Sequence, residues 1–137
     1  MSGHIKMKDM TWTEYAGRKE DILILPIGAT EQHGPHLPLC VDTVLAEEFS
    51  YRIAGQVDGI VAPALCYGYK SKPFSGGGPL FPGTIDLNGQ TLQNLVQDVI
   101  DEFVRDSGGS SCSTHILRMN PLWWRQWTCV QPGMGIG

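Results

Sequence analysis

Residues 21–28 read Asp-Ile-Leu-Ile-Leu-Pro-Ile-Gly, an unbroken apolar run that ends with a proline and a glycine. Successive side chains of a strand point to opposite faces of its sheet, so a run without polar alternation indicates a strand buried on both faces. Sheets covered on both faces are mostly parallel and have helices in two outer layers. This stretch therefore predicts an α/β fold.

The residues after this run continue the same pattern. A helix is predicted to start at Asp42, with Leu45, Phe49 and Ile53 repeating every fourth residue as its apolar face. Residues 59–65 are again apolar and predict a second short buried strand. Before the first strand, either Thr11 or Thr13 can cap a short helix.

Residues 89–106 carry the strongest helix signal in the chain. Asn88 offers a cap and Gly108 a stop, and the apolar stripe comprises Leu92, Leu95, Val96, Val99, Ile100, Phe103 and Val104. The order strand, helix, strand, helix predicts a layered α/β/α architecture with a mainly parallel sheet and right-handed crossovers. The same alternation requires a third strand shortly after Gly109.

The last part of the chain does not fit that requirement. Residues 110–115 are polar, and residues 120–137 hold three of the four tryptophans without periodicity, cap or alternation. We therefore divide the chain into residues 1–108, part of one α/β domain, and residues 109–137, an aberrant and irregular tail. Without a third strand, a sheet edge and part of the helical stripe at 89–106 would be exposed, which predicts low stability or aggregation.

Composition narrows the class of protein. The chain has 137 residues, 42% of them hydrophobic and 18% charged, as expected of one globular domain. A net charge of −4 gives no electrostatic support for binding nucleic acid. No apolar run approaches the ~18 residues of a membrane span, and the first residues lack the core of a signal peptide. The four cysteines form no CxxC pair and are expected to be free thiols in a cytoplasmic protein.

Three ionisable residues follow the first strand: Glu31, His33 and Asp42. The carboxyl end of a strand is where open α/β sheets bind ligands, and carboxylate with imidazole suits Zn²⁺ or Mn²⁺. The group predicts metal-assisted hydrolysis. Other interpretations are open: Asp42 is equally suited to cap the next helix, and Glu31 can be a solvated loop residue. His36 fits an ordinary loop histidine better than a ligand.

A second group lies in the long loop from Cys66 to Asn88. Ser75, Gly76, Gly77 and Gly78 leave backbone N–H groups open to a carbonyl or carboxylate of a ligand. A plain surface loop explains the glycines equally well. Tyr67 and Tyr69 can lie in the core or line the pocket of a flat, polar ligand.

Over residues 11–108 the chain resembles the creatininase family. The resemblance is carried by 25–34 (L-P-I-G-A-T-E-Q-H-G), Asp42, 67–71 (Y-G-Y-K-S), 75–78 (S-G-G-G) and 81–84 (F-P-G-T). It implies a layered α/β fold, a site for two Zn²⁺ or Mn²⁺ ions that activate a hydroxide, and opening of a cyclic amide such as creatinine to creatine.

The same resemblance implies residue roles and an assembly state. Glu31 and His33 would each hold one metal ion, Asp42 would bridge both, and Ser75–Gly78 would touch the substrate. Such enzymes form homo-hexamers.

Members of the family continue with a strand that ends in a motif such as N-A-H-F-E-N, whose histidine is a ligand and whose glutamate belongs to the catalytic site. That motif is absent here, and His115 has a different context, so the catalytic residues are not assigned. Back-translation of residues 111–125 in the next reading frame permits V-L-N-A-H-F-E-N-E-P-I-M-V-E. We infer a frameshift between about residues 106 and 112. The alternative function is a catalytically incomplete remnant or interaction fragment of the family.

Overall fold

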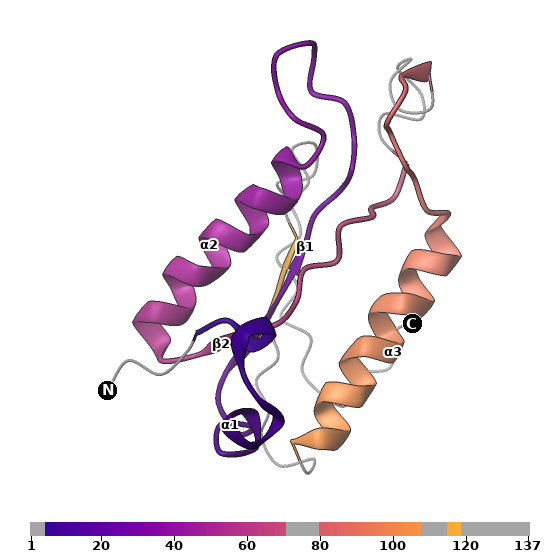
Figure 1. Ribbon diagram of the computed structural model, residues 1–137. Helices are drawn as coiled ribbons and strands as arrows, with labels where there is room; N and C mark the ends of the chain where they lie inside the picture. Colours follow the sequence, from indigo (N-terminus) through magenta and orange to yellow (C-terminus); the bar gives the residue numbers. More distant parts are fainter. Residues whose placement is uncertain (1–4, 71–79, 108–114, 119–137) are drawn as a thin grey trace.

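The computed structural model describes residues 5–70, 80–107 and 115–118. Three strands form one parallel sheet in the order β2-β1-β3. The helix α2 covers one face and α3 the other, so the layers are α/β/α (Figure 1). In chain order the elements are η1 (Met7–Asp9), α1 (Trp12–Ala16), β1 (Leu23–Ile27), α2 (Val41–Val57), β2 (Ile60–Val61), α3 (Gly89–Asp106) and β3 (His115–Arg118).

The central strand β1 is buried along its whole length, as its apolar sequence predicts. Leu23, Leu25 and Ile27 point to the face that α3 covers, where Val96, Val99 and Phe103 pack against them and their neighbours. Ile24 points to the opposite face and packs with Ala54 of α2. The strand therefore forms the core of both layers.

The second strand is shorter than the predicted stretch 59–65. Only Ile60 and Val61 form β2, and they pair in register with Leu23 and Ile24. Pro63 has no N–H to donate to the ladder, so regular pairing stops before it. The chain returns to β1 at Leu65, whose N–H donates to the carbonyl of Pro26 at 3.0 Å.

The third strand is present, inside the segment that the sequence predicts to be irregular. His115–Arg118 forms β3, and its residues pair in parallel with Ile24–Ile27 of β1. The edge of β1 that faces away from β2 is therefore covered, and the prediction that it would be exposed is wrong.

The predicted apolar face of α2 is also wrong. Leu45, Phe49 and Ile53 are 43%, 47% and 36% exposed. The buried face instead carries the small residues Ala46, Ser50 and Ala54, which are fully buried. Both sets repeat every fourth residue, but only small side chains let the helix axis come close to the sheet.

The other helices begin where the sequence predicts. Thr11 rather than Thr13 caps α1: its hydroxyl accepts the N–H of Glu14, and the Glu14 carboxylate accepts the N–H of Thr11 at 2.7 Å. Asn88 caps α3 by accepting the N–H of Thr91. Of the apolar stripe on α3, only Leu92 is buried and Leu95 is 39% exposed, so the stripe is partly uncovered as predicted. No helix of the described residues could cross a membrane.

Candidate metal centre

Glu31, His33 and Asp42 converge at the carboxyl end of β1. One ligand atom from each side chain lies within 4.8 Å of the other two. The Nε2 atom of His33 is 3.4 Å from Oδ1 of Asp42 and 4.0 Å from Oε1 of Glu31. Among the described residues, this is the group of three that could hold a metal ion.

The close approach of α2 to the end of β1 brings the third residue to the other two. A Cβ at Gly28 would lie 2.5 Å from the Cα atom of Thr43, so only glycine fits at this contact. The Thr43 hydroxyl donates to the carbonyl of Ala29 at 3.2 Å. These contacts hold the first turn of α2 against the loop, and Asp42 lies in that turn.

The His33 ring is held by the main chain of its own loop. Its Nδ1 atom lies 3.1 Å from the carbonyl oxygen of Glu31. A carbonyl can only accept a hydrogen bond, so Nδ1 carries the proton and donates it. In the neutral ring the lone pair is then on Nε2, the atom that faces the two carboxylates. A hydrogen bond of this kind from the other ring nitrogen fixes the orientation of most metal-binding histidines.

Asp42 does not cap α2, so that alternative interpretation is wrong. The residue before the helix is Cys40, which makes no side-chain capping bond, and Asp42 lies within the first turn. Its side chain is buried. The pKa of Asp42 is raised to about 6, chiefly by burial and also by the hydrogen bond and charge of Glu31, whereas His33 acts to lower it. Two carboxylates held together in a buried site favour either a proton or a cation between them.

The loop that carries Glu31 and His33 is held by two later segments of the chain. The Thr30 hydroxyl donates to the carbonyl of Cys66 at 2.8 Å, and the N–H of Gln32 donates to the Thr84 hydroxyl at 3.2 Å. Sequence reasoning missed these threonines. Their only sequence signal is a position in motifs of the resemblance, at 25–34 and 81–84, and the partners are far apart in the chain.

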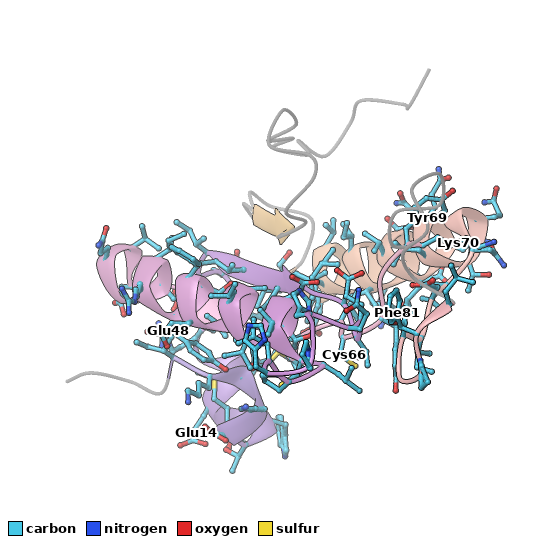
Figure 2. All side chains as sticks on the ribbon, turned by 90° about the horizontal axis from the view of Figure 1, so that it is seen from above. Glu14, Glu48, Cys66, Tyr69, Lys70 and Phe81 are labelled. Carbon is cyan, nitrogen blue, oxygen red and sulfur yellow. The ribbon has the colours of Figure 1, made fainter. Side chains whose placement is uncertain are left out.

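The remaining candidate residues have different outcomes. Glu31 is not solvated, because its side chain is 15% exposed, whereas His36 is exposed on the loop. Tyr67 and Tyr69 are not in the core, since they are 46% and 44% exposed. Figure 2 shows Tyr69, Lys70 and Phe81 toward the end of the molecule opposite Glu48 and Glu14, with Cys66 nearer the middle. The predicted substrate-binding residues Ser75, Gly76, Gly77 and Gly78 lie outside the described residues.

The chemistry of the three donors fits a divalent ion. Two carboxylates and one imidazole nitrogen are the ligand types of many catalytic zinc sites, in which three protein ligands leave a coordination position open. The same donors suit Mn²⁺, which accepts oxygen ligands readily. Cys40 and Cys66 are free thiols, as predicted for them, and neither belongs to the group.

Comparison with known proteins places this chain in a family. The family model for Creatininase (creatinine amidohydrolase) matches residues 8–108. The creatinine amidohydrolase of Pseudomonas putida is 44% identical over 108 residues, which are 77% of this chain and 42% of that protein. The mycofactocin precursor peptide peptidase of Mycolicibacterium smegmatis is 37% identical over 81 residues, 55% of this chain and 31% of that protein.

Solved structures agree with the sequence comparisons. A mutant creatininase of Zn-Zn type has a TM-score of 0.75 and 40% identity, and the match covers 83% of this chain and 44% of that one. A manganese creatininase has the same TM-score and coverage at 39% identity. The chain thus spans less than half the length of these relatives. These likenesses and the fold show that the chain belongs to the creatininase family of amidohydrolases.

Proposed function

We propose that this site is that of a metal-dependent amidohydrolase that opens a small cyclic amide such as creatinine to creatine. The observation that carries the proposal is the convergence of Glu31, His33 and Asp42 within 4.8 Å of one another. Independent support comes from the 44% identity to a creatinine amidohydrolase.

In this proposal Glu31, His33 and Asp42 would together hold the Zn²⁺ or Mn²⁺ ions. A bound ion would polarise the amide carbonyl and lower the pKa of water near it. The residues of this chain orient the ligand atoms for such an ion. The hydrogen bond from Nδ1 of His33 to the main-chain carbonyl of Glu31 keeps Nε2 directed at the carboxylates. The Asp42 side chain itself is buried, whereas those of Glu31 and His33 are partly exposed.

Creatinine is proposed as the substrate because of the likeness to one creatinine amidohydrolase. The family also contains other hydrolases. A relative at 32% identity, from Thermotoga maritima, is a 3-dehydro-scyllo-inosose hydrolase. We propose that Ser75, Gly76, Gly77 and Gly78 contact the amide substrate through their backbone N–H groups. Cytoplasmic location and homo-hexameric assembly stay predictions.

A second candidate function is a catalytically incomplete remnant or interaction fragment of the family. One observation favours it: residues 109–137 lack the histidine and glutamate motif described above. The inferred frameshift explains both the missing motif and the tryptophan-rich tail. The nucleotide sequence tests it, because it either encodes N-A-H-F-E-N in the neighbouring frame or does not.

The experiment that tests the function uses the full chain and, as its matched control, a gene with the reading frame restored. We expect the chain to bind Zn²⁺ or Mn²⁺ in calorimetric titration, and the restored protein to hydrolyse creatinine. Metal binding without hydrolysis by the chain itself would favour the incomplete remnant. Hydrolysis by the chain would favour the complete enzyme. Absence of metal binding in both proteins would disprove the metal site.

A further inference from the structure

The turn of residues 81–84 contacts the loop that carries Glu31 and His33 at two points. At the first point, Gly83 lies against Leu39: a Cβ at Gly83 would be 2.6 Å from a methyl carbon of Leu39. Gly83 also has a φ of +86°, which favours glycine. The carbonyl of Leu39 accepts the N–H of Glu31 at 3.1 Å. Leu39 therefore lies against Gly83 with its side chain and is hydrogen-bonded through its carbonyl to Glu31, a proposed metal ligand.

At the second point, the Thr84 hydroxyl accepts the N–H of Gln32 at 3.2 Å. Gln32 stands between Glu31 and His33, so the hydroxyl holds the stretch of backbone that joins the two ligands. The next residue, Ile85, donates its N–H to the carbonyl of Thr30 at 3.0 Å. The hydrogen bond to Thr30 is thus made by the main chain of this segment, whereas the hydrogen bond to Gln32 is made by the Thr84 side chain.

We propose that Thr84 is a positioning residue of the metal centre, which sets the spacing of Glu31 and His33 through the backbone of Gln32. The proposal rests on the proposed function, because it assumes that these residues bind a metal ion.

The test compares four variants of the full chain. Thr84→Val keeps the shape of the side chain but removes the acceptor, Thr84→Ala removes the acceptor and its bulk, and Thr84→Ser keeps the hydroxyl. Thr13→Val, on α1 at the far end of the molecule from the ligand loop (Figure 1), is the matched control. Zn²⁺ affinity is measured by calorimetry, and Co²⁺ bound in place of Zn²⁺ reports ligand geometry through its visible absorption spectrum.

We expect Thr84→Val and Thr84→Ala to weaken Zn²⁺ binding by about 10–100-fold, the range typical of removing a hydrogen-bonding group that supports metal ligands. Both should change the Co²⁺ spectrum, whereas Thr84→Ser and Thr13→Val should keep the wild-type affinity and spectrum. If the valine variant does not fold, as judged by circular dichroism, the alanine and serine variants decide. Wild-type affinity and spectrum in either hydroxyl-free variant would overturn the proposal but leave the metal site standing. Absence of Zn²⁺ binding by the wild-type chain would overturn both.

Discussion

The two long helices cover opposite faces of the same strand in different ways. The helix α2 presents Ala46, Ser50 and Ala54 to the sheet, and all three are completely buried. The helix α3 presents larger apolar residues, of which only Leu92 is buried. Figure 1 shows α2 and α3 on either side of β1.

This difference follows from the role of each helix at the site. The helix α2 supplies Asp42, so its first turn must lie at a fixed distance from the loop that holds Glu31 and His33. Backbone contact at Gly28 and small buried residues achieve that distance. No residue of α3 belongs to the described ligand group, so α3 can be held by side-chain packing alone. Close packing is therefore found where the chemistry needs precision.

The largest effect is expected from Gly28→Ala, which breaks the close approach of α2. The new Cβ would meet the backbone of Thr43 at 2.5 Å, and backbone cannot move aside as a side chain can. We expect the free energy of unfolding to fall by about 3 kcal/mol, the upper range for overpacking, and Zn²⁺ binding to be lost. Urea unfolding and calorimetric titration measure the two effects.

The matched control is Gly55→Ala, within α2 itself. A Cβ there meets only a methyl carbon of Ile5, at 3.9 Å. This change should raise the free energy of unfolding by about 0.5–1 kcal/mol, because glycine inside a helix is unfavourable. Equal behaviour of the two alanine variants would contradict the role given to Gly28.

The second-largest effect tests Asp42 as a metal ligand, independently of how α2 packs against the sheet. Asp42→Asn keeps the side-chain shape but removes a charged ligand. Zn²⁺ affinity should fall by more than the roughly 10–100-fold that is typical when a group that only supports a metal ligand by a hydrogen bond is removed. The metal-free variant should be at least as stable as the wild type at neutral pH, because a buried charge is gone. Calorimetry and urea unfolding test this, with Asp98→Asn, exposed on α3, as control.

The third effect tests which face of α2 is buried. Ala54→Leu should lower the free energy of unfolding by about 1–3 kcal/mol, since the site has no room for added methylenes. Phe49→Ser should change it by less than about 0.5 kcal/mol, because the phenylalanine is already 47% exposed. Urea midpoints measured side by side decide. The reverse order of the two variants would restore the apolar face predicted from the sequence.

The smallest effect is a pH dependence of the metal-free chain. The pKa of Asp42 is raised from 3.8 to about 6 in the folded protein. Between these values the folded chain holds a proton that the unfolded chain has released. The stabilising contribution of protonated Asp42 is therefore complete below pH 3.8 and is lost as pH rises through about 6.

Metal binding must displace that proton. We expect Zn²⁺ affinity to rise with pH up to about pH 6, with proton release on binding below that value. Calorimetry in buffers of different ionisation enthalpy measures the release. A pH-independent affinity between pH 5 and 7 would show that Asp42 does not bind the ion.

Local signals predicted much of the fold and of the site. The apolar run of β1 and the capped stripe of α3 are single-element patterns, and their bounds agree with the structure within two residues. The grouping of Glu31, His33 and Asp42 was predictable because all three flank one strand end. The buried face of α2 was not predictable, because its large apolar residues and its small residues both repeat every fourth position. Only the approach distance to the sheet distinguishes them.

Other features depend on partners distant in sequence. The bond between Gln32 and Thr84 joins two loops, and neither residue alone signals it. The third strand was missed because its four residues stand in a polar setting and gain their order from pairing with β1.

The register of the sheet has a consequence for how the chain folds during synthesis. Leu23 of the central strand meets Ile60 on one side, whereas its neighbour Ile24 meets His115 on the other. The first pairing closes a short loop and can form early. The second must wait until residue 115 has left the ribosome, and long-range parallel pairing is slow. In that interval one flank of β1 is open to chaperones or to neighbouring chains.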